Sequence, residues 1–275
     1  MSSSSEKVND DPIGRTSLTS AAARASESNR SNPLLQDPFA RIYAGQIGPE
    51  SVESFSHMEQ TTVELFTTDI VVRARYLDDL LTKMAVTIKQ IVILACGGDF
   101  RPYRLSLTNS SSATNFYLLD VPQVLAYRQQ CLERLQPLTP TANCKIVEIA
   151  CDLTNDKWLS KLVEHGFHSD QPTFWLAEGF FQYLVEKDVR RIFDQIRQVS
   201  AKDSHIAFDL VSSRRQKALT IIRFTLDDEQ EVRRIFTELG CVEIECTPFQ
   251  QVGTMYGRSV SRDRTFIVNA KLSHL

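Results

Sequence analysis

The sequence has no apolar run long enough to span a bilayer, and its Ser-rich start has no apolar core of a signal peptide. It also lacks an excess of charge of one sign. Its 31 basic and 34 acidic residues leave a formal net charge of -3 at pH 7. This balance gives no reason to expect a nucleic acid or an anionic membrane as a partner. We therefore expect a soluble, cytoplasmic protein.

The sequence lacks clusters of cysteine and histidine. The six cysteines are scattered, with no C-x-x-C pair and no group of histidines beside them. This spacing argues against a zinc site and against a secreted disulfide scaffold, so we expect no bound metal. None of the five histidines falls in a motif, and we assign none of them a catalytic role.

Apolar segments of strand length recur along the chain and alternate with helical patterns. The expected strands are 91–95, 115–119, 145–149, 173–177, 205–211, 241–246 and 265–271. Expected helices between them cover 122–135, 156–165 and 186–199, and a further helix ends at Gly240. This order predicts an α/β fold: a Rossmann-like, doubly wound, seven-stranded sheet with helices on both faces and an N-terminal helical extension.

The part of the chain before the sheet divides into two segments. We expect residues 1–14 to be a disordered tail and residues 15–88 to form a helical extension on the lid or substrate side. Thr16 is the candidate N-cap of its first helix; further helices are expected at 37–43 and 59–84. Residues 89–275 would then form the ligand-binding domain, with polar loops at 108–114 and 212–227.

The ends of the first two expected strands indicate a nucleotide-like ligand. The first strand runs into Gly97 and Gly98, where backbone can approach a ligand closely, and the second ends at Asp120. A carboxylate in that position accepts hydrogen bonds from ribose hydroxyls in nucleotide-binding βαβ units. The pair predicts a cofactor that contains adenosine.

The glycine turn favours S-adenosylmethionine over a nicotinamide dinucleotide. A dinucleotide site usually has a third glycine to cradle the diphosphate, and none follows here. Asp99 would also face the diphosphate as an anion, whereas an acidic group is compatible with a cofactor that carries a positive charge. A tight turn with no ligand is the alternative that the motif alone leaves open.

Several segments in one order resemble the leucine carboxyl methyltransferase family, including its bacterial members that act on small molecules. They cover roughly residues 16–184 and lie at 16–25, 32–40, 73–79, 97–105, 120–124, 151–153 and 175–184. The resemblance implies a class I methyltransferase that uses S-adenosyl-L-methionine. Two positions depart from the family pattern, because Ala95 stands where Gly is usual and Phe100 where Thr is common.

The resemblance also implies roles for individual residues. Arg24 would hold the methionine carboxylate, with Arg73 or Arg75 as the second basic contact. Glu178 would lie near the cofactor's amino group, while Gly97 and Asp99 belong to the binding turn. Asp152 would contact the adenine amine, and Leu153 would supply a backbone contact and an apolar wall.

Some of these side chains could instead have purely structural roles. Asp120 and Glu178 could be ordinary solvated carboxylates, and Asp152 could cap the helix that follows it. Tyr183 and Arg101 are candidates for the substrate side, although Tyr183 could belong to the core and Arg101 could pair with Asp99. We assign no general acid or base.

The expected reaction is direct transfer of a methyl group to an oxygen of a small molecule, as in natural-product biosynthesis. A carboxylate acceptor is already ionised and needs no base, whereas a hydroxyl acceptor would require one. A protein C-terminal carboxylate is the alternative acceptor, and a catalytically silent, cofactor-binding homologue or a nicotinamide oxidoreductase are the alternative functions. The sequence does not indicate an oligomeric state.

Overall fold

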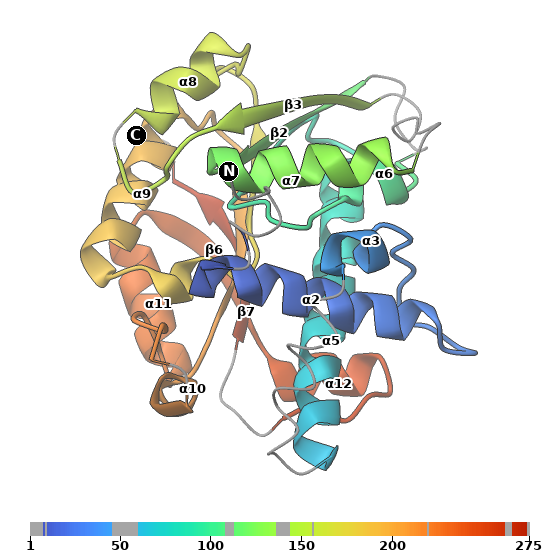
Figure 1. Ribbon diagram of the computed structural model, residues 1–275. Coiled ribbons are helices and arrows are strands. Elements are labelled where there is room, and N and C mark those ends of the chain that lie inside the picture. The colour runs from blue at the N-terminus through green and yellow to red at the C-terminus, as the bar shows by residue number, and fades with distance from the viewer. Residues whose placement is uncertain are drawn as a thin grey trace.

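A computed structural model describes residues 8, 10–45, 60–107, 113–135, 144–155, 157–218, 220–261 and 266–273. These residues form one α/β unit in which helices cover both faces of a central sheet (Figure 1). The strands are β1 (Gln90–Leu94), β2 (Thr114–Asp120), β3 (Cys144–Ala150), β4 (Thr173–Ala177), β5 (His205–Leu210), β6 (Cys241–Pro248) and β7 (Phe266–Leu272).

The helices precede the sheet or connect its strands. They are α2 (Pro12–Ser28), α3 (Ala40–Ala44), α5 (Gln60–Met84), α6 (Arg101–Arg104), α7 (Pro122–Glu133), α8 (Trp158–Glu164), the 3-10 turn η2 (Phe181–Tyr183), α9 (Glu186–Val199), α10 (Ser213–Ala218), α11 (Glu229–Glu238) and α12 (Phe249–Met255). Among these described helices, none is long and apolar enough to cross a membrane.

The sheet has seven strands in the order β3-β2-β1-β4-β5-β7-β6. β1 to β5 are parallel, and β7 is antiparallel to both of its neighbours. The chain order reverses between β1 and β4, so the loops after these two strands diverge to opposite faces. Ligands of open α/β sheets bind at such a point, beyond the carboxyl ends of the strands.

Alternation along β1 divides the core into two layers. Val92 and Leu94 point to the face covered by α8, α9 and α11, while Ile91 and Ile93 point to the face covered by α5 and α12. All four side chains are at most 1% exposed. A strand buried on both faces is mostly apolar, and this is why a strand such as β1 could be predicted from the sequence.

The sequence predicted the strands to within two residues at each end, and the doubly wound, seven-stranded sheet is confirmed. The expected first helix was wrong at its start. α2 begins at Pro12, and its N-cap is Asp11 rather than Thr16, because the Asp11 carboxylate accepts hydrogen bonds from the N–H groups of Ile13 and Gly14. Residues 12–14 therefore belong to a helix and not to a tail, and Val8 is buried.

Two further expectations differ from the structure. The segment 212–227 was expected to be a polar loop, but it contains α10, and Ile222, Phe224 and Leu226 within it are buried. The short helix expected at 37–43 begins at Ala40. The expected surface loop at 108–114 lies largely outside the described residues.

Candidate active site

The turn after β1 has a backbone that few side chains tolerate. Ala95 has φ = 51° and Gly97 has φ = 45°, so both lie in the left-handed region. A Cβ on Gly98 would lie 2.7 Å from the ring of Tyr43, because α3 packs directly on the turn. The packing of α3 therefore requires glycine at position 98, whether or not a ligand is bound.

Asp120, at the end of β2, is held by two main-chain donors. It accepts hydrogen bonds of 2.7 Å from Gly97 N–H and from Val121 N–H. Burial nevertheless raises the pKa of Asp120 to about 6, above its ordinary value of 3.8. Because the Gly97 N–H is given to Asp120, it is not available to a diphosphate.

Glu178, directly after β4, lies between two arginines. It accepts a 3.0 Å hydrogen bond from Arg73 on α5 and a 2.7 Å hydrogen bond from Arg101 on α6. Burial alone would raise the pKa of Glu178, but the two guanidinium groups outweigh it and lower that pKa to about 2. Arg73 also pairs with Asp209 of β5 at 3.0 Å, and the second Asp209 oxygen accepts the Gly179 N–H at 2.5 Å.

These pairs continue into a chain of ion pairs beneath the turn. Arg101 also pairs with Asp99 and, at 2.6 Å, with Asp78; Asp78 pairs with Arg104 at 2.6 Å. We call this set the ion-pair chain. Its arginines are Arg24, Arg73, Arg101 and Arg104, and its carboxylates are Asp37, Asp78, Asp99, Glu178 and Asp209. With one carboxylate more than its arginines, it favours a ligand that carries positive charge.

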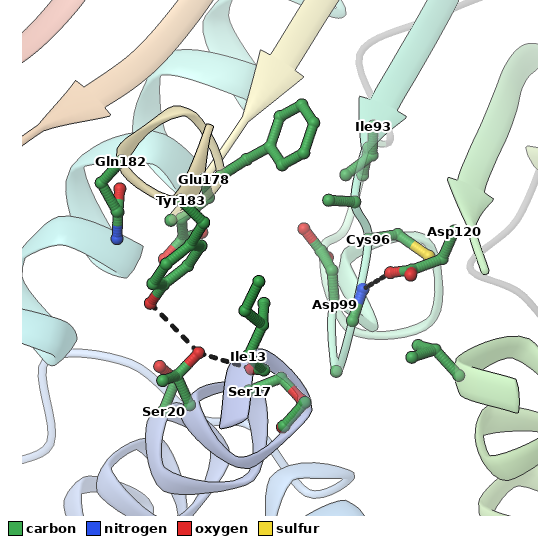
Figure 2. A pocket seen from close by; sticks show the side chains of 18 of the residues that line it. Ile13, Ser17, Ser20, Ile93, Cys96, Asp99, Asp120, Glu178, Gln182 and Tyr183 are labelled. Carbon is green, nitrogen blue, oxygen red and sulfur yellow. Dashed lines mark hydrogen bonds between the residues drawn. The ribbon is translucent and has the colours of Figure 1, made fainter. Parts of the chain in front are cut away.

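Arg24 connects the N-terminal extension to the glycine turn. Its Nε donates to Asp37 at 2.8 Å, and its Nη2 donates to the main-chain oxygen of Gly98 at 2.7 Å. The residue is only 8% exposed, and what remains exposed lines the cavity. α2 therefore forms one wall of the site (Figure 2).

A cavity of about 350 Å³ lies between α2 and the carboxyl ends of β1, β2, β3 and β4. That volume is in the range of small-molecule sites, about 300–1,000 Å³. Its lining includes all but one of the residues assigned from the sequence, namely Arg24, Arg73, Gly97, Asp99, Arg101, Asp120, Asp152, Leu153, Glu178 and Tyr183. In the described parts of the chain, no group of three or more His, Cys, Asp or Glu side chains could hold a metal ion.

The remaining assigned residue, Arg75, lies outside this lining. It donates to Asp79 at 3.0 Å and to the main-chain oxygen of Leu34 at 2.6 Å, and its side chain is 40% exposed. Arg73 and Arg75 are two residues apart on α5, so they point in different directions. Of these two arginines, only Arg73 lies where it could contact a ligand.

Comparison with known proteins places this site in a family. The family model for leucine carboxyl methyltransferase matches residues 17–197. The chain belongs to the leucine carboxyl methyltransferase family. This confirms the resemblance read from the sequence, and the matched region includes every residue assigned to the site.

Two curated relatives are named as S-adenosyl-L-methionine-dependent methyltransferases. The protein from Mycobacteroides abscessus is 35% identical over 212 residues, which are 72% of this chain and 65% of that protein. The protein from Mycolicibacterium smegmatis is 34% identical over 207 residues, 72% of this chain and 66% of that protein. The chain thus matches just under two thirds of the length of these relatives.

Solved structures support the fold at low identity. A DUF574 family protein from Streptomyces avermitilis has a TM-score of 0.62 at 12% identity, covering 92% of this chain and 97% of that chain. A structure from Thermobifida fusca, titled as a methyltransferase, has a TM-score of 0.54 at 14% identity, covering 91% of this chain and 94% of that chain.

The residues of this family member fit S-adenosylmethionine, the cofactor named for its relatives. Asp120 and the glycine turn would hold the ribose, and Leu153 and Asp152 would flank the adenine. Glu178 and Arg24 would take the charged amino acid end. At neutral pH this cofactor carries a sulfonium, an ammonium and one carboxylate, and its net positive charge complements the ion-pair chain.

The alternative interpretations have different outcomes. Asp152 does not cap α8, because the N-cap of that helix is Lys157; its exposed carboxylate accepts from Thr154 N–H at 2.8 Å within the preceding turn and lines the cavity. Arg101 does pair with Asp99, but it also holds Glu178 and is only 2% exposed, so it positions other side chains. Tyr183 lines the cavity and donates to Thr16 at 3.1 Å.

Sequence reasoning missed several residues of this site. Asp37 pairs with Arg24 and Asp209 pairs with Arg73, and Gln182 lines the cavity wall beside Tyr183. A signal for Asp209 was present, because a carboxylate inside the apolar strand 205–211 requires a buried partner. Gln182 is likewise the one polar side chain between the aromatic residues Phe181 and Tyr183.

Proposed function

We propose that this protein transfers the methyl group of S-adenosylmethionine to an oxygen of a small molecule, and that this oxygen belongs to a carboxylate. The proposal is supported by membership of the leucine carboxyl methyltransferase family and by the composition of the cavity wall. The observation that carries the choice of acceptor is the lack of a suitable base on that wall.

The wall opposite the glycine turn is mainly apolar. Its apolar members are Phe66, Ile70, Phe180, Leu184, Val211 and Ile222. The lining also includes uncharged polar side chains, among them Thr16, Ser20, Gln182 and Tyr183. Figure 2 shows Gln182 and Tyr183 on one side of the cavity with α2 below. Such a surface suits a compact, largely apolar acceptor with a few polar groups.

Among the described residues that line the cavity there is no histidine and no lysine. The carboxylates that line the cavity are committed elsewhere. Glu178 pairs with Arg73 and Arg101, Asp37 with Arg24, and Asp99 with Arg101, while Asp11 caps α2. Asp120 and Asp152 accept main-chain hydrogen bonds on the side that we assign to the ribose and the adenine, away from the acceptor wall. With its pKa held at about 2, Glu178 is a poor proton acceptor at neutral pH. An acceptor that arrives already ionised meets no obstacle here, and a carboxylic acid is such an acceptor.

When bound, S-adenosylmethionine supplies a strongly electrophilic methyl group, so the protein needs mainly to align the acceptor and exclude water. The ion-pair chain holds Glu178 and Arg24 in fixed positions around the glycine turn. The apolar wall desolvates an acceptor carboxylate, which strengthens its nucleophilicity. No proton has to be moved by the protein for the ester to form.

A cytoplasmic location is part of this proposal. The buried cysteines Cys96, Cys131, Cys151, Cys241 and Cys246 form no disulfide, which suits a reducing compartment.

The acceptor class is tested with methyl-labelled S-adenosylmethionine and three sets of compounds. These are small aromatic carboxylates, the matching phenols, and peptides that end in a free leucine carboxylate. We expect label in the small carboxylates. Label in the peptides alone would assign the protein C-terminal activity instead, and label in the phenols alone would require a base that the described lining does not offer. Binding of cofactor without transfer to any of the three sets, or to the metabolites of a cell extract, would identify a silent homologue.

A further inference from the structure

Gln182 lies on η2, the 3-10 turn that follows β4, and its side chain lines the cavity beside Tyr183 (Figure 2). The residue is 5% exposed. Its main-chain oxygen accepts hydrogen bonds from Arg223 N–H at 2.7 Å and from Phe224 N–H at 3.2 Å. These two bonds fix the backbone of Gln182 against the wall that also contributes Ile222.

The side-chain oxygen of Gln182 is buried and has no hydrogen-bond partner among the described residues. Buried polar groups in folded proteins nearly always have a partner, and an exception at a functional site calls for an explanation. Here the unsatisfied oxygen belongs to a side chain that lines the proposed acceptor wall. A bound molecule with a hydrogen-bond donor would satisfy it.

Three neighbouring polar side chains on this wall, Tyr183, Thr16 and Arg215, are already engaged. Tyr183 donates to Thr16, whose hydroxyl donates in turn to the main-chain oxygen of Ile13 at 2.7 Å. Arg215 pairs with Asp69 and lies over the ring of Phe66 at 5.5 Å. Gln182 therefore differs from these neighbours, because its side chain lines the cavity while its amide oxygen has no partner among the described residues.

We propose that Gln182 determines acceptor specificity by accepting a hydrogen bond from a hydroxyl or N–H group of the acceptor molecule. The inference rests on the proposed function and makes it more specific. The acceptor is then a small acid that carries, besides the carboxylate, at least one hydrogen-bond donor on an otherwise apolar body. An acid without such a donor would leave the buried oxygen unpaired and bind less well.

The first test needs no acceptor. Gln182→Met removes the unsatisfied oxygen at nearly constant volume, so we expect a higher melting temperature than that of the wild type. Gln195 is the matched control, because it is also buried, at 8% exposure, but its side-chain oxygen accepts a 2.8 Å hydrogen bond from the indole of Trp158. Gln195→Met should therefore lower the melting temperature. An equal loss in both variants would overturn the proposal, because the Gln182 amide would then be structural.

The second test uses methyl-labelled S-adenosylmethionine and a total metabolite extract. We expect Gln182→Met to reduce the labelled product at least tenfold while its affinity for S-adenosylhomocysteine stays within twofold of the wild type. The wild-type product should retain an exchangeable hydrogen, which deuterium exchange counts by mass spectrometry. Equal labelling by both proteins, or a product with no exchangeable hydrogen, would overturn the specificity role. No labelled product from the wild type would instead refute the proposed function, and the melting temperatures would then decide about Gln182.

Discussion

The guanidinium group of Arg24 donates a 2.7 Å hydrogen bond to the main-chain oxygen of Gly98, a residue 74 positions later in the chain. This bond joins α2 to the glycine turn that lines the cavity. The same side chain pairs with Asp37, which in turn accepts hydrogen bonds from the N–H groups of Phe39 and Ala40. One arginine thus fixes both N-terminal helices on the glycine turn, so the extension is part of the site and not an appendage.

Replacing Arg24 with alanine should weaken binding of S-adenosylhomocysteine by about 1.5–3 kcal/mol, the range for hydrogen bonds to charged groups. It should also destabilise the fold by about 3 kcal/mol, because it leaves the buried Asp37 without its closest partner. Calorimetry and thermal unfolding measure the two effects. Arg41→Ala, an exposed change on α3, is the control for loss of charge and should alter neither. Wild-type affinity in Arg24→Ala would show that α2 only packs against the site.

Binding of S-adenosylhomocysteine should weaken about tenfold between pH 7.5 and pH 5, as only about one tenth of a carboxyl with a pKa near 6 is ionised at pH 5. The sign follows from the raised pKa of Asp120, since protonation removes the charged acceptor for the ribose hydroxyls. The raised pKa also means that ionisation of Asp120 does not stabilise the folded apoprotein. The contribution of Asp120 to the free energy of unfolding therefore falls as the pH rises from about 4 to 6. Calorimetry at several pH values measures the affinity.

The control for this pH dependence is Asp120→Asn, which should bind about 1–3 kcal/mol more weakly at pH 7.5 and show a flat profile. A steep profile that persists in Asp120→Asn would assign the titration to another group.

Replacing Ala95 with glycine should raise the stability by up to about 1 kcal/mol, because the Cβ of Ala95 is strained at φ = 51°. For a chain of this size the melting temperature should rise by about 2–4 °C. Ala22→Gly, in the regular helix α2, is the matched control and should lower the stability by about 0.5–1 kcal/mol. A fall in the melting temperature of Ala95→Gly would mean that the Cβ makes contacts that outweigh its strain.

S-adenosylhomocysteine should raise the melting temperature of the protein, and NAD at the same concentration should not. A ligand at one hundred times its dissociation constant stabilises the native state by about 2.7 kcal/mol. The discrimination arises because the Gly97 N–H is committed to Asp120 and the ion-pair chain has an excess of carboxylates. A shift with NAD alone would contradict the cofactor assignment.

β1 and β4 could be predicted from the sequence because they are buried along their whole length and are apolar after their first residues, Gln90 and Thr173. The positions of Asp120 and Glu178 followed from this, since they come directly after strands whose ends share one edge of the sheet. The start of α2 was missed because Thr16 and Asp11 are both good caps, and the choice depended on Pro12.

What the sequence could not give is the pairing between distant positions. Arg73 is 136 positions from its partner Asp209, and nothing local to either residue indicates the other. The same holds for Gln182, since the lack of a partner is a property of the folded cavity and not of a motif. α10 was missed because its sequence is polar and its helix is only 6 residues long, so it shows little periodicity.

If the site methylates a carboxylate oxygen that is already ionised, as proposed, the product is a methyl ester, and its lability in alkali distinguishes it from an ether. The protein is incubated with methyl-labelled S-adenosylmethionine and a metabolite extract, and the labelled small molecules are brought to high pH. A methyl ester of a carboxylate releases its label as volatile methanol under these conditions, and this is the expected result. Label that stays bound to the product would identify an ether or an N-methyl group and would contradict the account of a base-free carboxylate site.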